Sequence, residues 1–210
     1  MIHRLSQVVA GWIGKQTQNH SVPVIAYGIE IFLNAIIQLS AVLLIAYWLG
    51  QLGPSLAVLL SFVILRVVAG GKHLSTFWGC TLADVLLVNG LAWVALAGTK
   101  APALIHGPVL ALLTLSTGLA IHRYAPLITV RRPVSHLQVH GRTYSRWVVV
   151  VATAIAAACY FVEPAYSMAI ILGLAAEAFS ITPTGCKALD QFDRWLSSYS
   201  FSFKERRESP

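Results

Sequence analysis

A histidine and a cysteine seven residues apart are the part of this sequence best suited to chemistry. His73 and Cys80 lie in "RVVAGGKHLSTFWGC", residues 66–80, between two long apolar runs. A cysteine attacks as its thiolate, and it needs a base or a positive environment to reach that form. Histidine is the usual base for such a nucleophile. The pattern therefore predicts a cysteine nucleophile, Cys80, that is activated by His73.

The spacing also restricts the local structure. On one continuous helix the two residues would be separated by about 10.5 Å along the axis, whereas direct contact needs about 3–4 Å. Gly70, Gly71 and Gly79 bracket the segment and permit sharp turns of the backbone. We therefore expect one helix to end near Gly70 and the next to begin near Cys80.

The expected start of the second helix has signals of its own. Thr81 is followed three residues later by Asp84, which resembles a capping box. Such a cap would place Cys80 at a helix N-terminus, where the helix dipole favours a thiolate. Lys72 and Arg66 add positive charge nearby. Asp84 is either this cap or a third group that orients the histidine, as in catalytic triads.

Each of these residues also has a purely structural interpretation. A lone cysteine in an apolar helix commonly acts as a small space-filling side chain, and a lone histidine at a helix end is commonly an interfacial residue. Cys159, within "AIAAACYF", is expected to be a packing residue, and Cys186, which has no obvious base, a structural one. Three widely spaced cysteines predict neither a disulfide framework nor a CxxC site.

The composition is that of a membrane protein. Of the 210 residues, 57% are hydrophobic and 11% are charged, whereas a soluble domain carries about 25% charged residues. Crossing a bilayer takes about 20 consecutive apolar residues in a helix. We therefore expect residues 1–210 to form a single all-α integral membrane domain with six transmembrane helices. The predicted spans are approximately 24–49, 54–69, 80–98, 103–121, 147–162 and 165–182.

The basic residues orient these spans. Lys and Arg number 15 against 8 Asp and Glu, which gives a formal net charge of +7. With the N-terminus in the cytoplasm and six crossings, 14 of the 15 fall on the inner side and only Lys100 falls outside. The positive-inside rule therefore predicts N-in/C-in topology, with residues 66–80 at the cytoplasmic face. This accounts for the basic charge without a nucleic-acid partner.

Two amphipathic segments and one polar stripe complete the pattern. Apolar residues recur at helical spacing in 2–13 and 189–199, which predicts interfacial helices near both termini. Within the first span, Glu30, Asn34 and Gln38 lie along one helix face. Polar groups at that depth act as interhelical contacts, with Glu177 in the last span as a partner, or they line a path for a polar substrate or a dimer contact.

Two other classes of protein fit part of the pattern. A small transporter or exporter of a peptide or other solute would use the polar stripe. A membrane metalloenzyme would use His136 and His140, which stand four residues apart, with His122 and His73. The chain has no HExxH motif and no nearby acid to complete a metal site. We therefore expect no metal and no other cofactor.

The segment "RVVAGGKHLSTFWGC" resembles the signature of the accessory gene regulator B family, AgrB. These are membrane-embedded cysteine endopeptidases of bacterial quorum-sensing systems. The family pattern has an arginine, a glycine shortly before a histidine, and a cysteine seven residues later. Here these are Arg66, Gly71, His73 and Cys80, with "STFW" between the last two.

Weaker matches extend the resemblance over about residues 20–185. They are "YAP" at 124–126, the basic pair and proline at 131–133, and the Glu-Pro turn at 163–164. The sequence departs from a related pattern in that Gly79 separates Trp78 from Cys80.

The resemblance implies a reaction on an AgrD-like propeptide, which has an amphipathic leader, a short core with an internal Cys or Ser, and an acidic C-terminal tail. Cys80 would attack the peptide bond at the end of the core, and His73 would transfer the proton to the leaving amine. The acyl-enzyme thioester would then be attacked by the peptide's own thiol or hydroxyl, giving a thiolactone or a lactone.

The resemblance also implies partners and a location. The acidic tail would be bound by basic side chains, Arg131 and Arg132 in the long basic loop, with Arg66 and Lys72 closer to the chemistry. An amphipathic leader would dock on the lipid bilayer. The family further suggests a homodimer in the bacterial plasma membrane.

Overall fold

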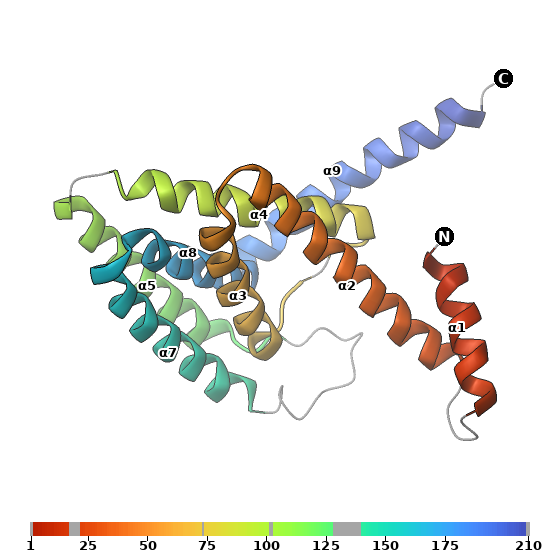
Figure 1. Ribbon diagram of the computed structural model, residues 1–210, viewed down its shortest axis with the longest axis horizontal. Helices are drawn as coiled ribbons and strands as arrows, with labels where there is room; N and C mark the ends of the chain where they lie inside the picture. The colour runs from red at the N-terminus through yellow and green to blue at the C-terminus, as the bar shows by residue number, and fades with distance from the viewer. Residues whose placement is uncertain (1, 17–21, 73, 101–102, 128–139, 209–210) are drawn as a thin grey trace.

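The described part of the chain is helical almost throughout. The computed structural model describes residues 2–16, 22–72, 74–100, 103–127 and 140–208 (Figure 1). The helices it contains are α1 (Ile2–Gln16), α2 (Val22–Trp48), α3 (Leu52–Ala69), α4 (Phe77–Gly98), α5 (Ala103–Tyr124), α7 (Gly141–Val162), α8 (Pro164–Ser180) and α9 (Pro183–Glu208).

Each of the six ranges predicted as a membrane span coincides with a helix, from α2 to α8. Among the described residues, α2, α3, α4 and α7 are long and apolar enough to cross a membrane. A fifth crossing arises if α8 and the first part of α9 count as one span broken by a bend of 83°. The all-α class and the membrane character are therefore confirmed, whereas the count of six spans and the N-in/C-in topology stay predictions.

Helix α8 lies at the centre of the bundle, where α3, α4, α5 and α7 all pack against it (Figure 1). More than half of its residues are buried. By contrast, α1 packs on α2 away from the bundle, and the far half of α9 projects from it (Figure 1). The amphipathic terminal segments are thus separate helices at both ends, as the sequence predicts.

The closest approach in this bundle is between α3 and α8. A Cβ added at Gly173 would lie 2.1 Å from the Ser61 side-chain oxygen and 2.5 Å from the Val58 carbonyl oxygen. Small residues at a helix crossing let two backbones approach each other in a membrane, where packing replaces the hydrophobic effect as the driving force. Gly173 therefore fixes how α8 is placed along α3.

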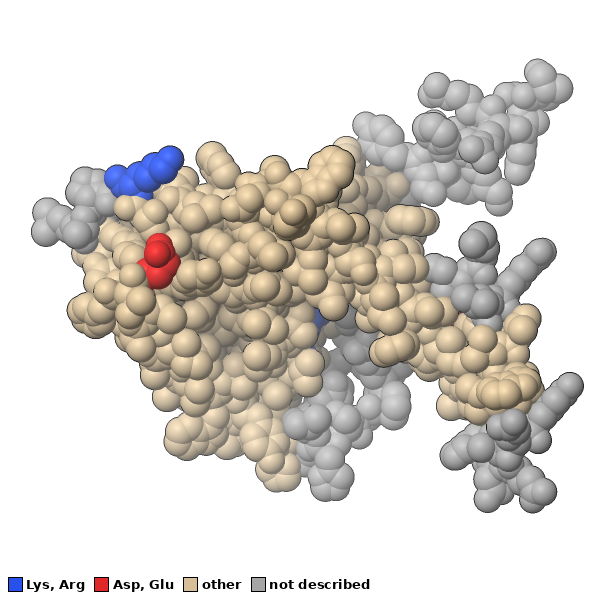
Figure 2. Space-filling view, in the orientation of Figure 1, with Lys and Arg blue, Asp and Glu red and all other residues tan. Residues whose placement is uncertain are grey.

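The outer surface is apolar. Trp48 at the end of α2 and Phe161 near the end of α7 are 84% and 87% exposed. Among the described residues on the face shown in Figure 2, the visible Lys, Arg, Asp and Glu atoms cover only small areas. Contiguous apolar surface of this extent is rare on soluble monomers. It is the expected surface of a protein surrounded by lipid.

Substituting Gly173 with alanine tests the packing of α3 on α8. We expect Gly173→Ala to lower the free energy of unfolding by ~1–3 kcal/mol, because the new methyl group meets the Val58 backbone, which cannot rotate away. Thermal unfolding of the purified protein in detergent measures this. Gly118→Ala on α5 is the matched control, since nothing lies within 4 Å of its added Cβ. Equal unfolding temperatures for the two variants would contradict the close approach.

Candidate active site

Residues 70–76 form the connecting segment between α3 and α4. The segment leaves α3 at a glycine, as predicted. Gly70 has φ of +76°, in the left-handed region, and its N–H donates to the Arg66 carbonyl at 3.0 Å. The Leu127 N–H donates to the Ala69 carbonyl at 2.8 Å, and a Cβ at Gly70 would lie 2.4 Å from the Leu127 carbonyl oxygen. Glycine is required here by both the backbone conformation and the space. The end of α3 is thereby tied to the chain that follows α5.

Helix α4 begins at Phe77, three residues before the expected start. Its N-cap is Thr76, whose hydroxyl oxygen accepts from the Gly79 N–H at 3.2 Å. A Cβ at Gly79 would lie 2.6 Å from that oxygen, which explains why glycine precedes the cysteine. The predicted cap at Thr81 is wrong, because its hydroxyl lies inside the helix and donates to the Phe77 carbonyl.

Cys80 is the fourth residue of α4, so it lies in the first turn, where the helix dipole is positive. Its sulfur lies 3.8 Å from the Leu74 carbonyl oxygen, and its N–H donates to the Thr76 carbonyl at 3.1 Å. The side chain is half-buried. The thiol thus faces back toward the connecting segment rather than along α4.

Asp84 lies one turn further along α4, and its carboxylate accepts from the Gln38 amide of α2. The expectation that Asp84 caps the helix is wrong, because Thr76 does so, and the alternative that Asp84 orients His73 stays a prediction. The polar stripe on α2 is an interhelical contact at Gln38. A second polar cluster in the same region joins α3 to α4, since the Ser55 hydroxyl lies 3.2 Å from the Asn89 side-chain oxygen and Gln51 donates to the Asn89 carbonyl.

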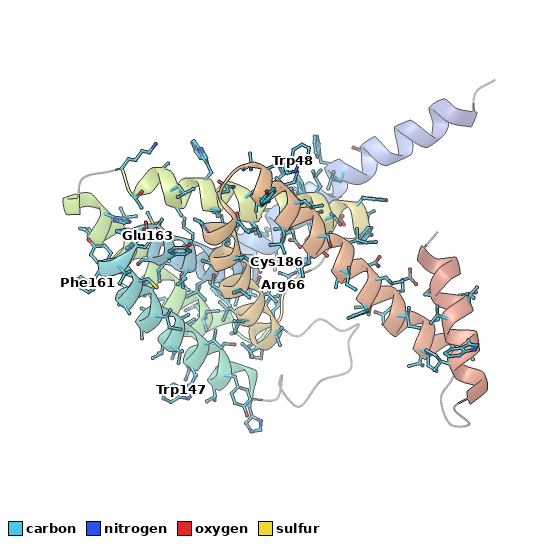
Figure 3. All side chains as sticks on the ribbon, viewed as in Figure 1. Trp48, Arg66, Trp147, Phe161, Glu163 and Cys186 are labelled. Carbon is cyan, nitrogen blue, oxygen red and sulfur yellow. The ribbon has the colours of Figure 1, made fainter. Side chains whose placement is uncertain are left out.

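Arg66, in the last turn of α3, makes the main polar contact between α3 and α8. One guanidinium nitrogen lies 2.9 Å from the Glu177 carboxylate, and the other donates to the Lys72 carbonyl. Glu177 is 0% exposed. The expected pairing of Glu177 with the polar stripe is therefore wrong. In Figure 3, Arg66 lies in the middle of the bundle.

Helix α9 holds the same connecting segment from the other side. The Lys72 ammonium pairs with Asp190, and the Ser75 N–H and hydroxyl both donate to one Asp193 oxygen, at 3.1 and 2.9 Å. Sequence reasoning found the apolar face of this helix but not its acidic residues. Their spacing of three was the available signal, because it places both on one helix face.

Comparison with known proteins identifies the family. The family model described as "Accessory gene regulator B" matches residues 6–181. The chain belongs to the AgrB family. It is 28% identical to an AgrB-like protein of Halalkalibacterium halodurans over 93% of this chain and 94% of the relative. It is also 26% identical to the accessory gene regulator protein B of Staphylococcus intermedius, over 61% of this chain and 65% of the relative. No solved structure matches the chain.

AgrB is a family of membrane peptidases, so membership implies a role in AgrD processing. The arginine, glycine and cysteine of the resemblance lie in order along this region: Arg66 in α3, Gly71 in the connecting segment and Cys80 in α4. Its histidine, His73, lies outside the described residues, as do Arg131, Arg132 and His136. The roles expected of these four residues stay predictions.

A second cysteine of this AgrB chain has the same local surroundings as Cys80. Thr182 precedes α9, its hydroxyl accepts from the Gly185 N–H at 3.0 Å, and the Cys186 sulfur lies 3.5 Å from the Ser180 carbonyl oxygen. The two sites share the pattern Thr-x-x-Gly-Cys. A cysteine in a capped first turn is therefore not in itself distinctive here. Cys80 differs from Cys186 in that its thiol faces the connecting segment, which contains Lys72 and is bonded by Arg66 of α3.

Removing the Asp193 carboxylate tests how α9 holds the segment. We expect Asp193→Ala to speed hydrogen exchange of the Ser75 amide about fivefold, because an exposed bond to a carboxylate contributes ~1 kcal/mol. Hydrogen–deuterium exchange with mass spectrometry of peptides covering residues 74–79 measures this. Glu163→Ala is the control, because it removes an exposed carboxylate elsewhere in the bundle (Figure 3). Unchanged exchange at Ser75 would show that α9 does not restrain the segment.

Proposed function

We propose that this AgrB-family protein is a cysteine endopeptidase that removes the C-terminal tail of an AgrD-like propeptide and promotes cyclisation of its core. The observation that carries the proposal is the position of Cys80. Its thiol faces a connecting segment in which the residues on either side of position 73 are anchored by hydrogen bonds. The family signature supplies the histidine within that segment.

The reaction uses two acyl transfers. The Cys80 thiolate attacks the carbonyl carbon at the end of the peptide core, after its proton has passed to His73. The imidazolium returns this proton to the leaving amine, so the tail departs and a thioester to Cys80 remains. The peptide's internal thiol or hydroxyl then attacks the thioester, closes the ring and releases Cys80 as a thiol.

The surroundings favour ring closure over hydrolysis. Exchange of one thioester for another is close to thermoneutral, so ring closure by a thiol of the peptide costs little free energy. Water is the main competitor of that thiol for the acyl-enzyme. Cys80 is half-buried in the first turn of the apolar helix α4. Limited water and a nucleophile held in the same chain both favour the intramolecular attack. We place this site at the cytoplasmic face of the plasma membrane, where the positive-inside rule puts the segment.

Basic side chains select the acidic tail. Lys72 already binds one carboxylate, that of Asp190, at a half-exposed position. A carboxylate of the tail would exchange with Asp190 there, while Arg131 and Arg132 in the long loop contribute positive charge. Arg66 is bound to Glu177 and to the Lys72 carbonyl, so it contributes to the potential of the site. The amphipathic leader would dock on the lipid surface.

A transporter is less well supported. The polar stripe on α2 suggested a transporter, but Gln38 of that stripe is hydrogen-bonded to Asp84 of α4, which is an interhelical contact.

Homodimer formation, implied by the family, stays part of the proposal.

Replacing Cys80 tests the reaction. We expect Cys80→Ala to lower propeptide cleavage by on the order of 10³-fold or more, because the nucleophile is lost. Cys159→Ala and Cys186→Ala should retain cleavage, and the latter is a matched control because it shares the local arrangement of Cys80. Mass spectrometry of propeptide incubated with the protein in lipid vesicles measures the released tail. Cleavage that persists in Cys80→Ala would end the assignment, and peptide flux that persists would favour a transporter.

Charge removal in the long loop tests tail recognition. We expect the double variant Arg131→Gln/Arg132→Gln to raise KM on the order of tenfold at low salt for a propeptide with an acidic tail. A propeptide whose tail carries Gln in place of Asp and Glu should show little change. Arg146→Gln, an exposed basic residue at the start of α7, is the control. Equal effects on the two propeptides would show that these arginines do not bind the tail.

A further inference from the structure

A buried acid in α8 has no assigned part in the reaction. Glu177 is 0% exposed and lies within a helix lined by small and apolar residues. Placing a carboxylate in such surroundings is costly unless a cation pairs with it, and ionisable residues at membrane depth usually have a functional reason. The contacts of Glu177 indicate what that reason is.

The packing of α3 on α8 sets the carboxylate opposite Arg66. Gly173 allows α8 to touch the Val58 and Ser61 region of α3, and Glu177 follows Gly173 by one helical turn. On α3, Arg66 lies just over one turn beyond Ser61. The two charged side chains therefore meet at 2.9 Å because the backbones are fixed one turn earlier.

Arg66 extends the contact from α8 to the connecting segment. The guanidinium holds the Glu177 carboxylate on one side and the Lys72 carbonyl on the other. Gly71 packs against this pair, because a Cβ there would lie 2.8 Å from one Glu177 oxygen and 2.9 Å from an Arg66 nitrogen. A flat guanidinium presents several donors in a fixed fork, so it can bridge two acceptors in a defined geometry.

The segment in turn contacts the nucleophile. Leu74, two residues after Lys72, presents the carbonyl oxygen that lies 3.8 Å from the Cys80 sulfur. A shift of Lys72 would therefore displace the immediate environment of the thiol. Glu177 thus contacts Arg66, Arg66 contacts Lys72, and Leu74, two positions further along the chain, contacts Cys80.

We propose that Glu177 is a positioning residue of the Cys80 site: its buried carboxylate orients Arg66, and Arg66 fixes the described residues of the connecting segment, 70–72 and 74–76, against the thiol. This inference rests on the proposed peptidase function. Asp84, the acid one turn beyond Cys80, is bound to Gln38 of α2, and its expected role in orienting His73 stays a separate prediction. Glu177 acts through Arg66 and does not touch the substrate.

The test removes the charge and keeps the shape. We expect Glu177→Gln to lower kcat about 10²-fold with a smaller change in KM, because misplaced reacting groups lose rate rather than binding. We also expect the rate at which iodoacetamide alkylates Cys80 to change severalfold in the absence of substrate. This rate is measured in a Cys159→Ala/Cys186→Ala background, so that only Cys80 reacts. Glu163→Gln is the matched control, because it neutralises an exposed glutamate and should leave both measurements unchanged.

A charge exchange separates positioning from helix docking. In the double variant Arg66→Glu/Glu177→Arg the ion pair can reform, so we expect the unfolding temperature to return toward that of the native protein. Cleavage should not return, because a glutamate at position 66 cannot donate to the Lys72 carbonyl. Recovery of both stability and cleavage would overturn the proposal and leave a purely structural ion pair.

The outcomes for the two proposals are distinct. Cleavage that survives in Cys80→Ala would remove the peptidase assignment itself. Cleavage that requires Cys80 but is unchanged in Glu177→Gln, together with unchanged alkylation of Cys80, would remove only the positioning role of Glu177.

Discussion

The ion pair between Arg66 and Glu177 is the interaction on which the site depends. Two charges are placed between apolar helices, and the loss of Arg66 would leave the Glu177 carboxylate, which is 0% exposed, buried without a cation. This makes one arrangement of α3 and α8 much more favourable than its neighbours. Because Arg66 also binds the Lys72 carbonyl, the direction in which the chain leaves α3 follows from the same arrangement. The ion pair between α3 and α8 inside the bundle thus determines the path of the connecting segment at the edge of the bundle.

The connecting segment shows how irregular backbone is held in a bundle of helices. Non-helical chain at membrane depth is tolerated where its polar groups find partners within the protein. Here the partners come from three directions: Arg66 of α3, Asp193 of α9, and the first turn of α4. The bend of 83° between α8 and α9 is what returns the chain to this segment. The C-terminal helix is therefore part of the site's support.

The sequence predicted the features that depend on local signals. Apolar length located each helix of the bundle, and the paired glycines located the end of α3 at Gly70. The start of α4 was misplaced because two threonines compete as caps. Thr81 matches a capping pattern with Asp84, but the helix begins one turn earlier, where the Thr76 hydroxyl accepts from the Gly79 N–H and Thr81 lies inside the helix. The partner of Glu177 could not be predicted, because it lies 111 residues away and is selected by the crossing of α3 and α8.

The two Thr-x-x-Gly-Cys sequences show why the local sequence pattern was also insufficient to distinguish the surroundings of Cys80 from those of Cys186. Cys80 and Cys186 both sit in a capped first turn, and each sulfur faces a carbonyl oxygen six residues earlier. The helix dipole, the cap and the glycine are therefore common to both thiols. Any difference in reactivity between them must come from groups that the rest of the fold supplies. Around Cys80 these are the segment held by Arg66 and Asp193, and they depend on α8 and α9, which follow it by more than eighty residues. The region around the signature residues is thus held in place by helices outside it.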